Sequence, residues 1–214
     1  MHGTPRPVSR PSSDLAPWLF PPDGTPLRQP PGPASGPAAV LFDRDGTLVD
    51  DVPYNASPDL VRPVPQARPA LDRLRALGVR TGVVSNQSGI ARGLLDRAQL
   101  IAIQERIEEL LGPFGVWAVC PHGPEDGCHC RKPRPGLVLA ACARLGVPPH
   151  RTVVIGDIGA DLGAARAAGA RGVLVPTPVT RREEVLAADE SAGDLLTAVR
   201  RLTSPVVPGM GRFR

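Results

Sequence analysis

The chain has 214 residues, of which 42% are hydrophobic and 3% aromatic, and its formal net charge at pH 7 is +4. This length suits one domain with a sizeable core, and no apolar run approaches the roughly 18 residues of a membrane span. The small charge excess and scarce aromatic side chains disfavour a nucleic-acid-binding protein, which needs basic patches and stacking platforms. Because no segment near the start resembles a secretion signal, we expect a cytoplasmic protein.

The first 37 residues differ in composition from the remainder of the chain. They carry eleven of the 27 prolines and show no hydrophobic period. Such a segment cannot bury enough apolar surface to offset the entropy lost on ordering. We therefore predict a disordered Pro-rich arm over 1–37, one domain over 38–202 and a flexible tail over 203–214.

Short apolar runs alternate with amphipathic segments from residue 38 onward. The runs are β-branched and uninterrupted, as in strands buried on both faces, and they cover 38–42, 79–85, 116–120, 152–156 and 172–176. Helices are predicted over 66–77, 96–111, 136–145, 160–168 and 192–202. This alternation predicts an α/β fold, a doubly wound, Rossmann-like and mostly parallel sheet. Ligands bind beyond the carboxyl ends of the strands in such sheets.

Three acidic residues follow predicted strands. Asp43 and Asp45 follow the first strand, one residue apart, and Asp157 follows the fourth. Like charges held this close repel unless a cation or a shared proton lies between them. Mg²⁺ takes one or two carboxylates together with phosphate oxygens. A metal-neutralised carboxylate can attack phosphorus while a second acid moves the proton, which predicts phosphoryl transfer through an aspartyl-phosphate.

Lys132 is the single lysine among 25 basic residues, the other 24 being arginines. A lysine provides a compact point charge, whereas an arginine presents a planar fork. A compact charge suits a crowded pocket of phosphate and carboxylate oxygens. We therefore place Lys132 in the same site as the acids.

A short loop with the spacing CxHx₅CxC precedes Lys132. The loop is rich in small residues and contains Pro and Gly. Its potential metal ligands are Cys120, His122, Cys128 and Cys130. Three thiolates and one imidazole form the ligand set of a closed structural zinc site. Disulfides are the rival interpretation, although no secretion signal supports an oxidising compartment. His129 could compete with His122 as the fourth ligand.

The motifs resemble those of the haloacid dehalogenase superfamily of phosphohydrolases. The matching stretches are DRDGT at 43–47, SNQSGI at 85–90, RKP at 131–133, and GD at 156–157 with Asp161. DRDGT, SNQSGIARG and a Cys/His loop ending in RKPRPG further resemble the D-glycero-D-manno-heptose bisphosphate phosphatase branch. The nearest relatives of that branch are histidinol phosphatases. The resemblance covers about residues 38–202 and implies removal of the 7-phosphate of D-glycero-D-manno-heptose 1,7-bisphosphate.

The resemblance also implies a role for each matching residue. Asp43 is the expected nucleophile and a Mg²⁺ ligand. Asp45 is the expected general acid and base, and it binds Mg²⁺ through its backbone carbonyl. Asp157 supplies the third protein contact to Mg²⁺, and Lys132 neutralises phosphoryl charge. The family pattern favours His122 over the alternative zinc ligand.

Ser85 is expected to hold phosphoryl oxygens at the catalytic centre. The expected substrate contacts are Asp51, Tyr54, Asn86, Gln87, Ser88, Arg92 and Arg131. About 40 residues separate Asp45 from Ser85, too few for an inserted cap domain beside the required helices. We therefore predict an open pocket. Tyr54 could equally be an ordinary half-buried tyrosine, and Arg92 a charge on a helix surface.

Two departures from the branch pattern keep alternatives open. Ile158 stands where the heptose enzymes usually carry Lys, and the loop between His122 and Cys128 is short, as in histidinol phosphatases. Histidinol-phosphate phosphatase is therefore the alternative activity, and a non-catalytic zinc-stabilised binding module is the alternative outside enzymes. For the favoured interpretation we expect a small phosphorylated sugar as substrate and a monomer or weak dimer.

Overall fold

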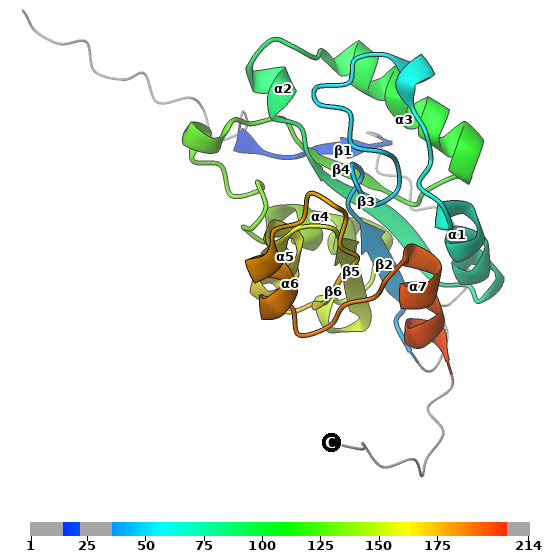
Figure 1. The fold of residues 1–214 in the computed structure, drawn as a ribbon. Coiled ribbons are helices and arrows are strands. Elements are labelled where there is room, and N and C mark those ends of the chain that lie inside the picture. Colours follow the sequence, from blue (N-terminus) through cyan, green and yellow to red (C-terminus); the bar gives the residue numbers. More distant parts are fainter. Residues whose placement is uncertain (1–14, 22–35, 205–214) are drawn as a thin grey trace, which may run out of the picture.

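The computed structural model describes residues 15–21 and 36–204. Within these ranges six strands form one sheet in the order β1-β4-β3-β2-β5-β6 (Figure 1). The strands are β1 (Trp18–Phe20), β2 (Ala39–Phe42), β3 (Arg80–Asn86), β4 (Trp117–Cys120), β5 (Thr152–Gly156) and β6 (Arg171–Leu174). All neighbouring pairs are parallel except β1 and β4. The predicted α/β sheet is confirmed.

Seven helices lie between and after the strands in the described ranges. They are α1 (Ala67–Ala76), α2 (Ser88–Ala91), α3 (Arg97–Leu111), α4 (Gly136–Leu145), α5 (Gly159–Ala168), α6 (Arg182–Ala187) and α7 (Leu195–Thr203). Short 3-10 turns occur at Pro58–Leu60, Pro124–Asp126 and Pro149–Arg151. A capping box begins α3, because Asp96 Oδ1 accepts from Gln99 N at 2.8 Å and Gln99 Oε1 accepts from Asp96 N at 2.9 Å. None of these helices is long and apolar enough to cross a membrane.

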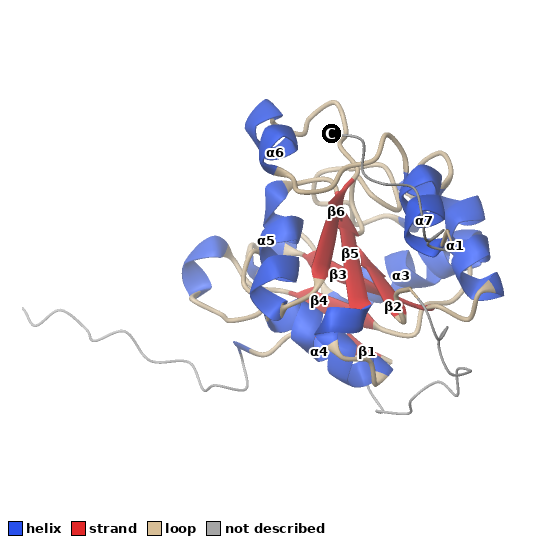
Figure 2. Cartoon of the chain, turned by 90° about the horizontal axis from the view of Figure 1, so that it is seen from below, coloured by secondary structure: helices blue, strands red, loops and turns tan. Residues whose placement is uncertain are grey.

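The sheet is covered on both faces, as its uninterrupted apolar strands predicted. In β2 the side chains of Val40 and Phe42 join the cluster beneath α1, α3 and α7, whereas Leu41 joins the cluster beneath α4 and α5. Figure 2 shows α5 and α7 on opposite faces of the sheet. All three side chains are fully buried, and burial of a large apolar side chain contributes about 1.5–3 kcal/mol. The strand that leads into the predicted site is therefore anchored from both sides.

Strand β1 corrects the predicted disordered arm. It pairs with β4 in a register that sets Leu19 opposite Ala118. The guanidinium carbon of Arg97 lies 5.3 Å from the ring centroids of both Trp18 and Phe20. The prediction of disorder is wrong for residues 15–21, because this short apolar stretch completes the edge of the sheet. Gly36 and Pro37, also placed in the arm, are described and precede β2, and Thr203, placed in the tail, ends the last helix at Leu195–Thr203. Residues 1–14 and 22–35 of the predicted arm and residues 205–214 of the predicted tail lie outside the described residues.

The strand order reverses beside β2. The chain continues from β2 to β3 and β4 on one side, and then places β5 and β6 on the other. The backbone N–H of Asp43 donates to the carbonyl of Ile155 at 2.9 Å, which ties the end of β2 to β5. Doubly wound sheets bind ligands at such a switch point. Between β2 and β3 the structure has loops, a 3-10 turn and α1, with no inserted cap domain.

Candidate active site

An acid–lysine cluster lies beyond the carboxyl ends of β2 and β5. Asp43 follows β2, Asp157 follows β5, and Asp161 lies in the first turn of α5. The Nζ of Lys132 lies 2.5 Å from Asp43 Oδ1 and 2.6 Å from Asp161 Oδ1, and it donates to the carbonyl of Val84 at 2.9 Å. Asp161 was recognised as part of a motif but was assigned no role, and the structure makes it an ion-pair partner of Lys132.

Burial and mutual repulsion shift the protonation of these groups. Burial, opposed by Lys132 and reinforced by Asp161, raises the pKa of the Asp43 carboxyl to about 8. Burial and the Asp161 charge raise the pKa of Asp157 to about 7. Burial lowers the pKa of the Lys132 ammonium, but Asp161 and Asp43 outweigh it, so the pKa lies above its usual value. One ammonium thus faces three carboxyl groups, which leaves an excess of negative charge for a cation to neutralise.

The donor set at this point fits a hard divalent cation. Asp43, Asp157 and Asp161 each offer a carboxylate oxygen, and these atoms lie within 4.8 Å of one another. Gly46, with a φ of +75°, brings the backbone after Asp45 against Asp157, since a Cβ at Gly46 would lie 2.5 Å from Asp157 Oδ2. Oxygen ligands of this kind suit Mg²⁺.

The Asp45 carboxylate is held by residues outside the acid–lysine cluster. Arg44 Nε donates to its two oxygens at 2.9 and 3.0 Å, and Gln87 Nε2 donates to its Oδ2 at 3.0 Å. The same Gln87 Nε2 lies 2.8 Å from Ser85 Oγ. Gln87, a predicted substrate contact, therefore links the predicted catalytic residues Asp45 and Ser85. Arg44 was missed, because a basic residue between two acids gives no sequence signal that distinguishes it from a surface charge.

Asn86 and Arg131 fix the loop that carries Lys132. The amide of Asn86 donates from Nδ2 to the carbonyl of Lys132 at 3.2 Å and accepts at Oδ1 from the Lys132 N–H at 3.1 Å. Arg131 Nη1 donates to the carbonyl of His122 at 3.4 Å. Both side chains, predicted as substrate contacts, thus make structural hydrogen bonds to the loop.

A cavity of about 220 Å³ opens beside Asp45. Its lining residues are Arg44, Asp45, Asp51, Val52, Pro53, Tyr54, Asn86, Gln87, Ser88 and Gly89. Tyr54 is 44% exposed, and its hydroxyl accepts from Arg92 Nη1 at 2.6 Å. The Arg92 guanidinium also lies over the Tyr54 ring, 5.4 Å from its centroid. Most of the predicted substrate contacts therefore gather around one cavity, with Arg92 reaching it through Tyr54.

The Cys/His loop forms a second, buried cluster. The Sγ atoms of Cys120 and Cys128 are 3.7 Å apart, and His122 Nδ1 lies 3.4 Å from Cys120 Sγ and 3.3 Å from Cys130 Sγ. Tetrahedral coordination at a Zn–S distance of about 2.3 Å would set the sulfurs about 3.8 Å apart. All the cysteines are free thiols, so the rival disulfides do not form. His129 is exposed and lies outside the cluster.

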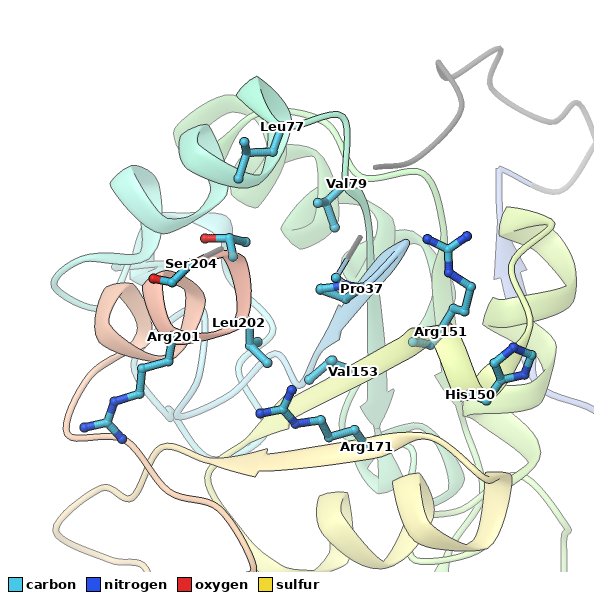
Figure 3. Close-up of a pocket in the computed structure, with 13 residues that line it drawn as sticks. Pro37, Leu77, Val79, His150, Arg151, Val153, Arg171, Arg201, Leu202 and Ser204 are labelled. Atoms are coloured by element: carbon cyan, nitrogen blue, oxygen red, sulfur yellow. The ribbon is translucent and has the colours of Figure 1, made fainter. Parts of the chain in front are cut away.

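A larger cavity, of about 580 Å³, lies at the opposite edge of the sheet, near the amino ends of the strands (Figure 3). Val153 and Leu202 contribute apolar lining, and Arg151, Arg171 and Arg201 contribute cationic side chains. None of the predicted site residues lines it. The predicted site residues instead gather at the smaller cavity, so cavity size and the predicted site do not coincide.

Comparison with known proteins identifies the family of the chain. A HAD-hydrolase-like family model matches residues 129–202. The chain is 41% identical over 143 residues to a D-glycero-beta-D-manno-heptose-1,7-bisphosphate 7-phosphatase of Pseudomonas aeruginosa, which covers 64% of this chain and 80% of the relative. It is 34% identical over 181 residues to the protein of that name from Pasteurella multocida. That alignment covers 78% of this chain and 98% of the relative.

Solved structures of phosphatases are also similar to this chain. The D,D-heptose 1,7-bisphosphate phosphatase of Bordetella bronchiseptica, complexed with magnesium and phosphate, superposes with a TM-score of 0.69 at 32% identity. The match covers 77% of this chain and 97% of that one. A HAD-like phosphatase from Mesorhizobium loti superposes with a TM-score of 0.65 at 31% identity, over 92% and 98% of the two chains.

A doubly wound sheet with acids and a lysine at its switch point places the protein among the enzymes with a Rossmann-like α/β fold. More narrowly, the chain belongs to the haloacid dehalogenase-like phosphatase family, in the branch that contains the D-glycero-beta-D-manno-heptose-1,7-bisphosphate 7-phosphatases. The family resemblance inferred from the motifs is confirmed.

Proposed function

We propose that this protein is a Mg²⁺-dependent phosphomonoesterase that removes the 7-phosphate of D-glycero-D-manno-heptose 1,7-bisphosphate through an aspartyl-phosphate on Asp43. The observation that carries the proposal is the meeting of Asp43, Asp157, Asp161 and Lys132 at the switch point of the sheet. The names of the relatives support the sugar substrate. The magnesium and phosphate in the Bordetella bronchiseptica structure support the cofactor.

The proposed reaction has two steps. A carboxylate oxygen of Asp43 attacks phosphorus, the bond from phosphorus to the sugar oxygen breaks, and that oxygen takes a proton from Asp45. Asp45 then takes a proton from water, whose oxygen attacks phosphorus. The bond from phosphorus to Asp43 breaks and inorganic phosphate leaves. Lys132 lies beside the attacking oxygen and offsets phosphoryl charge, and bound Mg²⁺ supplies further charge neutralisation.

The cavity beside Asp45 is the proposed place of the sugar. Asp51 and Ser88 line it, and both can exchange hydrogen bonds with hydroxyl groups. Tyr54 and Arg92 together present a ring, a hydroxyl and a cation at its rim. Arg131 is the further proposed recognition residue. This arrangement suits a small, polar, anionic substrate bound without a cap domain.

The Cys/His cluster is proposed to hold a structural Zn²⁺. Its sulfur spacing matches tetrahedral coordination, and its four protein ligands leave no open position for chemistry. Asn86 and Arg131 tie the same loop to β3 and to His122. The proposed metal therefore fixes the loop that delivers Lys132. Reduced thiols agree with the proposed cytoplasmic location.

Phosphate release tests the proposal, with heptose 1,7-bisphosphate and histidinol phosphate each assayed with and without Mg²⁺. We expect Mg²⁺-dependent hydrolysis that favours the heptose substrate and is lost in Asp43→Asn. Faster hydrolysis of histidinol phosphate would favour the alternative activity, to which the short loop between His122 and Cys128 points. Full activity of Asp43→Asn would exclude the covalent route. Failure to hydrolyse any phosphate ester, 4-nitrophenyl phosphate included, would leave the zinc-stabilised binding module. A monomer or weak dimer stays a prediction.

A further inference from the structure

Arg44, which lies between Asp43 and Asp45 in the sequence, is buried. The proposed reaction assigns it no role. Its side chain is 3% exposed, whereas that of Asp45 is 25% exposed. Arg44 therefore backs the Asp45 carboxylate from the protein side and leaves it accessible from the cavity that both residues line. Arg44 and Asp45 are adjacent in sequence. Adjacency alone does not bring their side chains together, and here the guanidinium turns toward the carboxylate.

Three side chains close a ring of hydrogen bonds. Arg44 Nε donates to Asp45 at 2.9 and 3.0 Å, and Arg44 Nη2 donates to Gln87 Oε1 at 3.1 Å. Gln87 Nε2 donates back to Asp45 Oδ2 at 3.0 Å and also lies 2.8 Å from Ser85 Oγ. Gln87 is itself buried, with 6% of its surface exposed. Because Gln87 starts the turn after β3, the ring ties Asp45 to the rigid sheet.

Stability does not explain this ring. A buried ion pair gains little net stability, because desolvation of the two charges offsets their attraction. The Nη1 atom of Arg44 is also a buried donor with no hydrogen-bond partner among the described residues. Such a donor costs about 1–3 kcal/mol. Apolar side chains in place of both charged partners would avoid both costs, so the ring is better explained by the position it imposes on Asp45.

We infer, on the basis of the proposed function, that Arg44 and Gln87 are positioning residues that hold Asp45 in line with the leaving oxygen of the substrate. Proton transfer needs donor and acceptor at hydrogen-bond distance and in alignment, and it contributes about 10²–10⁴-fold in rate. A carboxylate held from two sides keeps this alignment through both steps of the reaction. A carboxylate released from the ring would sample several rotamers.

The choice of leaving group separates this role from a merely structural one. A sugar alcohol leaves poorly and needs the proton of Asp45, whereas 4-nitrophenolate leaves as an anion with little need of it. The attack by Asp43 is common to both substrates. The first, phosphoryl-transfer step is to be followed in a single turnover, as release of the sugar monophosphate or of 4-nitrophenol, in the wild type and in Arg44→Met and Gln87→Met.

We expect each variant to slow transfer from heptose 1,7-bisphosphate by about 100-fold and transfer from 4-nitrophenyl phosphate by less than about threefold. The matched control is Arg106→Met, which removes an arginine that pairs with Glu109 on the exposed face of α3 and lies outside the site. Its ratio of the two rates should stay at the wild-type value. Circular dichroism checks the fold, and Gln87→Met decides the question where Arg44→Met does not fold.

Equal loss on both substrates, or no loss on either, would overturn the positioning role. Failure of the proposed function gives a different result, because the wild type itself would then fail to transfer phosphate from heptose 1,7-bisphosphate. A wild-type ratio of rates in Gln87→Met, combined with a changed ratio in Arg44→Met, would also refute the ring. That outcome would restrict the effect to Arg44 alone.

Discussion

Replacing Lys132 by Met removes the ammonium of the acid–lysine cluster while keeping a side chain of similar length. The side chains of Lys132 and Asp161 are 2% and 0% exposed, and their charged atoms are 2.6 Å apart. Asp43 lies 2.5 Å from the same nitrogen. Removal of one partner from a buried pair leaves an uncompensated charge and costs about 3–5 kcal/mol. We expect a loss of unfolding free energy of this size in Lys132→Met.

Urea unfolding without added Mg²⁺ measures the effect. The matched control is Arg166→Met, which breaks a pair with Asp189 whose side chains are 72% and 85% exposed, and it should cost about 0–1 kcal/mol. The double variant Lys132→Met with Asp161→Asn should recover part of the loss, because one unpaired charge is then absent. Equal losses in Lys132→Met and Arg166→Met would refute the buried-charge reasoning.

Three further outcomes are expected. Cys128→Ser should lower both the bound zinc, measured by metal analysis, and the melting temperature; wild-type values of both would contradict the zinc assignment. Burial raises the pKa of Asp43 to about 8 and that of Asp157 to about 7, so metal-free protein should lose stability as the pH rises from the ordinary carboxyl range toward 8, where ionisation opposes folding. The rise in melting temperature on adding Mg²⁺ should therefore grow with pH, and a pH-independent rise would count against a site at these acids. Gly46→Ala should abolish phosphatase activity and Mg²⁺ stabilisation, because its Cβ would lie 2.5 Å from Asp157 Oδ2 at a φ of +75°; retained Mg²⁺ stabilisation would show that the backbone can yield.

The elements that sequence reasoning found are those with a strong periodic or apolar signal. The five parallel strands and α1, α3, α4, α5 and α7 lie within a few residues of their predicted ranges. The missed elements are short. With three, four and six residues respectively, β1, α2 and α6 cannot show a hydrophobic period. Only the exposed edge of β4 provides the hydrogen-bond partners that make a strand of Trp18–Phe20.

The candidate site also contains residues that the sequence identified and residues whose roles only the structure shows. Asp43, Asp157 and Lys132 were recognisable from motif order and from the rule that strand ends carry ligands. Asp161 and Arg44 were not assigned a task, because their contacts are with residues distant in sequence or depend on a side-chain direction. Gln87 and Asn86 were predicted as substrate contacts, but their amides are engaged by Asp45, Arg44 and the Lys132 backbone.

The sequence by itself determined the alternation of strands and helices, the reactive residue types and their order along the chain. These properties depend on local periodicity and on side-chain chemistry, which a linear pattern carries. Only the tertiary structure decided that Lys132 bridges Asp43 and Asp161, and that Arg44 turns inward onto Asp45. A charged side chain enters the interior only where distant partners meet it at hydrogen-bond distance, and packing sets that distance after the sheet has formed.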